Sequence, residues 1–423
     1  MVLVEFRVKN FRSLRDEQVL SLVASPDPTF RSDNTLATGI QAAPFLLRSV
    51  AIYGANASGK SNLIKALQFM RGVVVESASL MQPGQKFSVQ PFRLNSSSTG
   101  QPSEFEVTIL VDGVRYQYGF SLDAERIVSE HLLVYRAFKP QRWFERWFDE
   151  ITGRDVYQYG PGLRGPKKLW EEATRPNSLY LSMAVQLNSE ALRPVFDWFL
   201  RQLRILNEVT PLAPNFTVSL LRQPDRRAAI RDFLRSADIS LSEIELESRR
   251  VPGRAVHMDV KTGNTEVRDE DVEAQRLRFH HVTEQGRAVF ELQDESSGTR
   301  ALLFLTGPVL DVLEKGRTLV VDELDTSLHT LLLRELVGLF HRPEINASGA
   351  QLVFTTHDTS LLSAFGLFRR DQIALVEQDV DQASELVWLS DFSPRKNEAL
   401  ERGYLSGRYG GVPLLQETLG MAR

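Results

Sequence analysis

A glycine-rich segment at residues 54–61 has the composition of a loop that holds phosphate groups. It reads Gly-Ala-Asn-Ala-Ser-Gly-Lys-Ser and matches the pattern GxxxxGK[ST] completely. Glycines let backbone N–H groups turn inward around phosphates, and a helix that begins directly after them adds partial positive charge. Lys60 is expected to bridge the β- and γ-phosphates of a nucleotide, and the Ser61 hydroxyl to bind Mg²⁺. The predicted nucleotide-binding residues of this loop are Gly54, Asn56, Ala57, Ser58, Gly59, Lys60, Ser61 and Asn62.

A second segment, residues 318–323, reads Thr-Leu-Val-Val-Asp-Glu and predicts a buried strand that ends in two acids. Asp322 is expected to hold the Mg²⁺ shell, directly or through water. Glu323 is expected to polarise the attacking water as the general base. Such a strand is common by chance, but together with the phosphate loop it predicts Mg²⁺-dependent hydrolysis of ATP. The chain has no NKxD motif for reading guanine, so a GTPase is disfavoured.

Two further segments lie on either side of this strand in the sequence. Residues 295–300 read Glu-Ser-Ser-Gly-Thr-Arg and precede a long apolar stretch, while residues 355–358 read Thr-Thr-His-Asp and follow an apolar strand. The simplest interpretation of the first is that Ser296 or Ser297 caps a helix at its N-terminus. That interpretation is compatible with anion binding, because a helix N-terminus attracts anions.

The four motifs in this order resemble the ABC-type ATPase head shared by SMC, RecF and OLD proteins. The resemblance implies that Ser296, Ser297 and Gly298 form a signature that caps the γ-phosphate held by an opposite subunit. It also implies that His357 contacts the γ-phosphate, which makes Glu323, His357 and Lys60 the predicted catalytic residues. Hydrolysis is then expected to need a homodimer or higher oligomer with ATP sandwiched between subunits.

The same resemblance assigns less specific positions. Arg12, in the segment Val-Lys-Asn-Phe-Arg-Ser-Leu at residues 8–14, is expected near the nucleotide. Asp325 and Ser327 are the expected D-loop residues, with His329 where many ABC proteins carry Asp. Gln90 is the candidate Q-loop residue, which joins Ser61 and Asp322 as the third expected metal ligand.

Closer similarity connects the chain to the RloA-like and AriA-like ATPases of bacterial anti-phage systems. The shared pieces include Pro-Phe-Arg-Leu at 91–94, Arg-Asp-Gln-Ile at 370–373 and Tyr-Leu-Ser-Gly-Arg-Tyr-Gly at 404–410. The resemblance implies a sensor or scaffold subunit that controls a separate effector, often a TOPRIM-type nuclease encoded alongside. The alternative is a RecF- or SMC-like DNA-repair ATPase acting directly on DNA. A transporter subunit is disfavoured by the long stretch between residues 61 and 296.

The elements that must position these residues alternate between strands and helices. The fold class predicted is α/β, an ABC-type P-loop head with a mixed or parallel sheet flanked by helices and with N-terminal antiparallel strands. We expect a discontinuous head formed by residues 1–90 and 276–423, with an inserted α+β region at 91–275 for dimer or partner contacts. The expected strands are 2–8, 17–22, 48–53, 243–249, 255–260, 276–282, 287–293, 318–322 and 351–355, with a meander over 105–138. The expected helices are 60–75, 186–206, 217–236, 298–315, 327–340 and 358–365.

Composition narrows the class of protein further. The 423 residues include no cysteine, which excludes disulfides, cysteine-ligated zinc and thiol nucleophiles, and also a zinc hook. No apolar run reaches the roughly 20 residues of a membrane helix, so a cytoplasmic protein without membrane contact is expected. The net charge of −4 does not indicate nucleic-acid binding, although local contact stays open.

Four weaker patterns have competing explanations. Basic and aromatic residues mix over 136–179, which suits nucleic acid, a partner protein or a hairpin packed on the sheet. Residues 276–281 contain the RxxxxH of helical ribonuclease toxins, but in a strand context that argues against it. The acids at 269–271 favour a solvated loop over a metal pair, and Arg402 and Arg408 suit either a partner surface or a plain surface helix.

Overall fold

The computed structural model describes residues 1–207, 215–237, 239–258, 265–363, 366–392 and 398–412. The chain divides into two compact units. Unit 1 comprises Met1–Glu208, Val312–Asp325 and Thr330–Arg423, and unit 2 comprises Val209–Asp311 and Thr326–His329. These boundaries differ from the expected ones at residues 90 and 276, because the strands that follow residue 90 join the N-terminal strands in one sheet.

Unit 1 contains a six-stranded sheet in the order β11-β15-β16-β5-β17-β18. Its neighbours are parallel except for the antiparallel pair β17 and β18. Every residue of β5, β15 and β16 is buried, as expected for parallel strands covered on both faces. The strands are β5 (Ser49–Gly54), β11 (Leu203–Leu206), β15 (Thr318–Val321), β16 (Gln351–Thr355), β17 (Ile373–Gln378) and β18 (Ser384–Trp388).

Three of these strands differ from the sequence-based expectation. The helix expected over 186–206 is broken into shorter pieces and ends as β11, which pairs with β15 as the edge of the sheet. β17 and β18 were not predicted, and β17 lies directly beside the strand that leads into the phosphate loop. Pairing with distant strands thus decides the conformation of these short segments.

A second, seven-stranded sheet in unit 1 is antiparallel, in the order β10-β9-β8-β7-β6-β1-β2. The meander expected over 105–138 is confirmed as β6 to β8, and β6 pairs with β1, so the sheet is continuous with the N-terminus. Residues along β6 alternate between buried and more exposed, as in a sheet with one covered face. The strands are β1 (Val2–Lys9), β2 (Gln18–Ser21), β6 (Ser103–Val111), β7 (Val114–Leu122), β8 (Ile127–Tyr135), β9 (Gln141–Asp149) and β10 (Arg154–Tyr159), with a separate pair β3 (Thr35–Ala37) and β4 (Phe45–Leu47).

Helix α2 (Lys60–Glu76) joins the two sheets of unit 1 through a shared core. Its apolar residues recur at helical spacing and are buried, among them Leu63, Leu67 and Met70. They belong to one cluster with Val107 of the antiparallel sheet and Val50 of the parallel sheet. The remaining helices of unit 1 are α1 (Arg31–Asn34), α3 (Ser96–Thr99), α4 (Lys167–Ala173), α5 (Tyr180–Gln186), α6 (Arg193–Asp197), the π-helix η1 (Trp198–Gln202), α10 (Thr330–His341), α11 (Ser360–Ser363), the 3-10 turns η2 (Arg370–Gln372) and η3 (Leu389–Phe392), and α12 (Leu400–Leu405).

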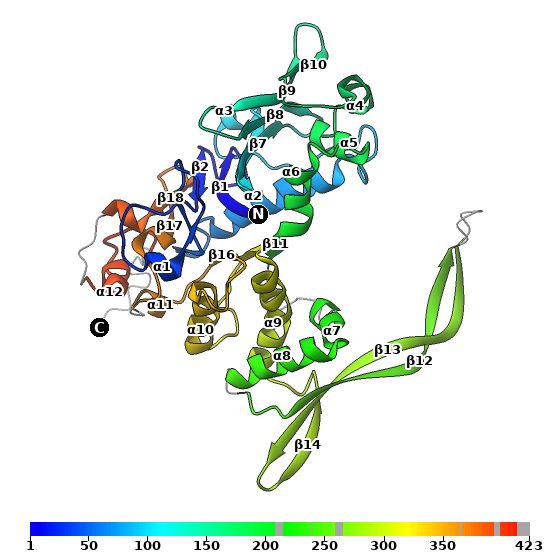
Figure 1. The fold of residues 1–423 in the computed structure, drawn as a ribbon, viewed down its shortest axis with the longest axis vertical. Coiled ribbons are helices and arrows are strands. Elements are labelled where there is room, and N and C mark those ends of the chain that lie inside the picture. Colours follow the sequence, from blue (N-terminus) through cyan, green and yellow to red (C-terminus); the bar gives the residue numbers. More distant parts are fainter. Residues whose placement is uncertain (208–214, 238, 259–264, 364–365, 393–397, 413–423) are drawn as a thin grey trace, which may run out of the picture. The chain divides into compact units, whose positions relative to one another are not determined.

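Unit 2 consists of two helices, a three-stranded sheet and most of a long helix. The strands expected at 243–249 and 255–260 form one strand, β12, described as far as Met258. β12 and β13 make a long two-stranded ribbon that extends away from α7 and α8 (Figure 1). The elements are α7 (Asn215–Leu221), α8 (Pro224–Ser236), β12 (Glu243–Met258), β13 (Thr265–Thr283), β14 (Gly286–Glu291) and α9 (Ser297–Lys315), which ends in unit 1. None of the described helices is long and apolar enough to cross a bilayer.

Candidate nucleotide-binding site

The predicted phosphate loop connects β5 directly to α2. Gly59 caps the helix with φ 108°, and Ala57 has φ 62°, so the loop turns through left-handed conformations. A Cβ atom on Gly54 would lie 2.5 Å from the Val376 carbonyl oxygen, and one on Gly59 would collide with the Ser384 hydroxyl. Only glycine fits at both positions, because the neighbouring strands approach the loop so closely.

Lys60 is buried within this loop with 6% of its surface exposed. Its ammonium donates to the carbonyl oxygens of Gly54 (2.8 Å) and Ala55 (2.9 Å). Burial lowers the pKa of Lys60, while the carboxylates of Glu323, Asp322 and Asp325 act to raise it. The predicted lysine and the predicted acids are thus electrostatic neighbours. The buried Ser58 hydroxyl has no hydrogen-bond partner among the described residues, which leaves a donor for a ligand in the loop.

Thr355, at the end of β16, fixes the two acids. Its hydroxyl donates to Asp322 Oδ1 (2.7 Å) and accepts from the backbone N–H of Glu323 (2.7 Å). Glu323 has φ 53°, a left-handed conformation that costs ~1–3 kcal/mol in a residue with a side chain. Asp322, the predicted metal ligand, is buried, whereas Glu323, the predicted general base, is exposed to solvent.

His357 is exposed beyond the end of β16 and is held through its backbone. Its N–H donates to Asp325 Oδ2 (3.1 Å), which brings the predicted switch histidine to a predicted D-loop residue. Asp325 Oδ1 is buried without a hydrogen-bond partner among the described residues. The carbonyl of the next residue, Asp358, accepts from the Tyr53 hydroxyl of β5 (3.1 Å). Segments from three strands therefore converge behind the histidine.

The N-terminal segment with Arg12 lies against the first turn of α2. The Ser13 hydroxyl accepts from Asn62 Nδ2 (2.7 Å) and from the Ser384 hydroxyl (2.7 Å). Arg12 itself has φ 54°, and its backbone N–H donates to the Gln90 carbonyl oxygen (2.7 Å). Gln90 is thus joined to the Arg12 segment by its backbone, while its role as a metal ligand stays a prediction.

The donor set around the loop fits a magnesium ion that arrives with a nucleotide. Within the described part of the chain, no group of three or more His, Cys, Asp and Glu residues could hold a metal. Mg²⁺ in phosphate-transferring sites uses one or two carboxylates and completes its shell with substrate phosphates. The Ser61 hydroxyl and the Asp322 carboxylate are donors of that kind. Bound there, the ion would neutralise charge that develops on the γ-phosphate.

The predicted signature begins α9 in unit 2. The Ser296 hydroxyl accepts from the N–H of Thr299 (3.1 Å), which confirms that Ser296 caps the helix. A Cβ atom on Gly298 would lie 3.0 Å from the Ser327 carbonyl oxygen, so the D-loop backbone packs on the signature glycine. Two elements that the sequence predicts to contact another subunit's nucleotide are therefore adjacent in unit 2.

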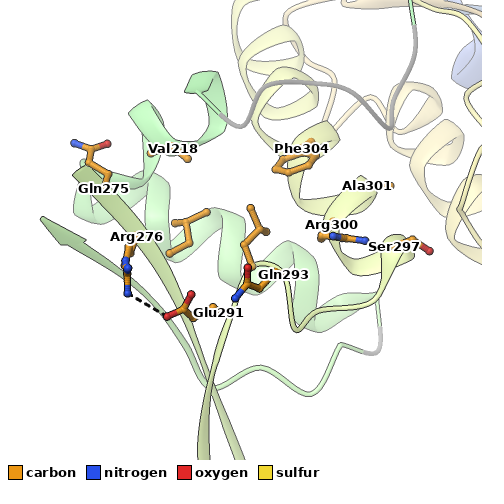
Figure 2. A pocket seen from close by; sticks show the side chains of 11 residues that line it. Val218, Gln275, Arg276, Glu291, Gln293, Ser297, Arg300, Ala301 and Phe304 are labelled. Atoms are coloured by element: carbon orange, nitrogen blue, oxygen red, sulfur yellow. Dashed lines mark hydrogen bonds and ion pairs between the residues drawn. The ribbon is translucent and has the colours of Figure 1, made fainter. Parts of the chain in front are cut away.

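A cavity of about 550 Å³ lies beside this helix within unit 2. Its walls come from α7, β13, the 291–293 segment and α9, with Phe304 directed into it (Figure 2). An ion pair between Arg276 and Glu291 (3.4 Å) borders it. The lining combines apolar side chains with charged and polar ones and includes Ser297 of the predicted signature.

The structure also decides between the explanations of the weaker patterns. Trp143 and Trp170 are buried in the core of unit 1, which favours the packed hairpin over base stacking. Arg276 lies in strand β13, so the helical ribonuclease context is absent from this segment. The acids at 269–271 lie in the same strand instead of a loop, where Asp269 pairs with Arg254 (3.0 Å).

Sequence reasoning missed Thr355, Ser13 and Ser384 as contributors to the site. Thr355 could have been found, because a hydroxyl residue at the end of a buried strand often lies among the side chains at that sheet edge. Ser13 lies in the motif at residues 8–14, where only Arg12 was assigned a role, and Ser384 lies in none of the recognised motifs. They reach the loop only through tertiary pairing of the N-terminal segment and of β18.

A glycine loop between a strand and a helix, with acids at a nearby strand end, defines a P-loop nucleotide-binding α/β protein. Residues 49–363 match the family described as "AAA domain, putative AbiEii toxin, Type IV TA system". Because the match spans more than half of the chain, the protein belongs to this family. No curated protein matches the sequence. Among solved structures, the chain is similar to the Smc head domain with an extended coiled coil, bound to the C-terminal domain of ScpA, from Pyrococcus furiosus, with 13% identity, TM-score 0.41 and coverage of 96% of this chain and 98% of that chain.

Proposed function

We propose that this protein is a Mg²⁺-dependent ATPase. The observation that carries the proposal is the position of Lys60, buried in a glycine loop and facing the carboxylates of Glu323, Asp322 and Asp325. In this proposal Lys60 binds the β- and γ-phosphates, and Ser61 and Asp322 hold Mg²⁺. Glu323, exposed at the rim, takes the proton of the attacking water, and His357 contacts the γ-phosphate.

We further propose that ATP closes a dimer that controls a separate toxic effector in bacterial anti-phage defence. The Ser296 cap and Gly298 supply a helix N-terminus suited to a phosphate from a second subunit. Closure with ATP and opening after hydrolysis give two states that an effector can distinguish. The toxin named in the family description is consistent with a defence role.

The direct test compares wild type with Glu323→Gln and Lys60→Ala for nucleotide binding, hydrolysis and mass in solution. Glu323→Gln is expected to bind ATP, to lose at least a hundredfold in turnover and to accumulate as a dimer with ATP and Mg²⁺. Lys60→Ala is expected to bind ATP poorly and to remain in the apo state. Full turnover by Glu323→Gln would overturn the assigned mechanism.

The role in defence is tested separately, by co-expression with the product of the neighbouring gene under phage challenge. Protection that is lost with Glu323→Gln, together with a complex between the two proteins, is expected. If DNA instead raises the hydrolysis rate and salt suppresses that effect, the protein acts as a RecF-type repair ATPase.

A further inference from the structure

The C-terminal element, residues 400–412, packs against the strand that leads into the phosphate loop. It consists of α12 and the turn that follows. The Tyr404 ring meets the Tyr53 ring of β5 edge-on, with centroids 5.7 Å apart and planes at 60°. A Cβ atom on Gly411 would lie 3.7 Å from Gly54 Cα. The backbone at Gly411 therefore lies close to the first glycine of the phosphate loop, with little room for a side chain between them.

Glycines and tyrosines in the element's own sequence make this contact possible. The Tyr404 hydroxyl donates to the Gly411 carbonyl oxygen (2.9 Å) and closes the turn. A Cβ atom on Gly403 would lie 2.6 Å from the Tyr409 hydroxyl oxygen, so the Tyr409 ring covers that glycine. Gly410 has φ 74°, and a side chain there would collide with Glu377. The Tyr-Leu-Ser-Gly-Arg-Tyr-Gly motif thus encodes a compact turn.

The same element also holds the segment that carries His357. Glu401 Oε1 of α12 accepts from the Thr359 hydroxyl (3.0 Å), two residues beyond the histidine. The Tyr53 hydroxyl donates to the Asp358 carbonyl oxygen (3.1 Å), while the Tyr53 ring rests on Tyr404. Residues 357–359 are thus restrained from two sides, and both restraints lead to the C-terminal element.

We propose that the C-terminal element positions His357 relative to the phosphate loop, with Glu401 and Thr359 as the positioning pair. The proposal rests on the ATPase function proposed above. Neither residue belongs to the loop or to the acid pair, so their loss should leave ATP binding intact. Without the Glu401 carboxylate, the Thr359 hydroxyl loses its acceptor. The segment could then rotate about the hydrogen bond between the His357 N–H and Asp325.

The test is a double-mutant cycle on this pair. Glu401→Ala and Thr359→Val are each expected to lower kcat for ATP about tenfold. This corresponds to a rise of about 1.4 kcal/mol in the activation free energy when His357 is less well positioned. KM for ATP should stay within about twofold. The double variant should be no slower than either single variant, because both remove one interaction. Glu401→Gln and Thr359→Ser keep an acceptor and a hydroxyl and should recover most of the activity.

Arg402→Ala is the matched control, because Arg402 is exposed on the same helix. It should match wild type in kcat and thermal stability. Unchanged kcat in Glu401→Ala, additive losses in the double variant, or losses of kcat that follow the fall in melting temperature would each overturn the positioning role. If wild type binds ATP but does not hydrolyse it, the ATPase proposal fails and this inference fails with it. If wild type hydrolyses ATP and the substitutions at Glu401 and Thr359 leave kcat unchanged, this inference alone fails.

Discussion

Two regions of unit 1 contain clustered acidic residues, and the regions differ in how deeply these residues are buried. Asp322 and Glu323 follow the carboxyl end of β15 in the six-stranded sheet, and both are hydrogen-bonded to the Thr355 hydroxyl. Inside the seven-stranded sheet, Glu130 is fully buried and accepts from the Tyr118 hydroxyl and from the backbone N–H of Tyr180 and Leu181, at 3.0, 2.7 and 2.9 Å. Burial raises the pKa of Glu130, an effect that nearby Arg146 opposes.

The difference lies in what remains open to a ligand. Both oxygens of Glu130 accept hydrogen bonds from donors of its own chain. Arg146 donates to the Asp155 carboxylate and to the Ser178 carbonyl oxygen. At the carboxyl ends of the parallel strands, by contrast, Glu323 is exposed, and the hydrogen bond from Thr355 occupies only Oδ1 of Asp322. A buried carboxylate with a perturbed pKa is therefore no sign of a functional site when donors of its own chain occupy both of its oxygens.

The largest expected effect concerns Arg146→Ala. Removing one partner of a buried pair leaves Glu130 uncompensated, which should lower the free energy of unfolding by about 3–5 kcal/mol. Urea denaturation measures this, and ATP binding should persist under conditions where the variant is folded. Arg142→Ala, at an exposed position of the same strand, is the control and should cost less than about 0.5 kcal/mol. A loss of ATP affinity in folded Arg146→Ala would show that the two regions are coupled.

Thr355→Val tests the strand-end acids of the six-stranded sheet, where we expect a loss of hydrolysis. It removes the hydroxyl that joins Asp322 and the Glu323 N–H, at little change in volume. We expect hydrolysis to fall about thirtyfold to a hundredfold, which is ~2–3 kcal/mol in the barrier. Steady-state kinetics measures this effect, and Thr355→Ser should restore most of the rate. A variant that hydrolyses normally would mean that the acids are held by other contacts.

A buried neutral group at the end of α10, facing β5 of the parallel sheet, gives a third comparison, through pH. His341 Nε2 lies 2.7 Å from the Ser49 hydroxyl, and burial lowers the pKa of His341 to about 3. The unfolded chain binds a proton near pH 6.5, so the folded state is fully stable above that pH and loses stability as pH falls towards 3. At pH 5 the loss should be about 2 kcal/mol.

Thermal melts between pH 7.5 and 5 measure this loss of stability. The variant His341→Gln should show a flatter dependence on pH than wild type. If both curves fall equally, other groups cause the acid sensitivity and the histidine is charged or accessible in the folded state.

The smallest expected effect distinguishes the two roles of Ser296. Ser296→Ala removes the helix cap and should cost about 1 kcal/mol of stability. Ser296→Asp keeps a cap but places a negative charge where a partner's γ-phosphate is proposed to lie. It should match wild type in melting temperature and yet hydrolyse ATP at least tenfold more slowly. Normal hydrolysis by the Asp variant would leave Ser296 with the capping role alone.

Much of the site could be predicted from the sequence because its parts are local. The loop at 54–61, the strand before it and the helix after it form a continuous signal, and β15 ends directly at its two acids. The helix cap at Ser296 or Ser297 is predicted for the same reason, and the structure shows that it is Ser296. Local patterns of this kind need no knowledge of distant pairing.

The remaining features depend on pairing between segments far apart in the sequence. β11 was expected as helix because Leu203–Leu206 has no local mark of a strand, and only β15 makes it one. The expected boundary at residue 90 did not foresee that β6 would pair with β1. The C-terminal glycine motif is visible in the sequence, but its position beside Gly54 follows from the fold alone.

The position of β16 between β5 and β15 has a geometric consequence. Neighbouring strands lie about 4.8 Å apart, so the loop strand and the acid strand are separated by about 10 Å. β16 thus fixes the distance between the phosphate-loop strand and the acid strand. Thr355, the last residue of β16, lies between them.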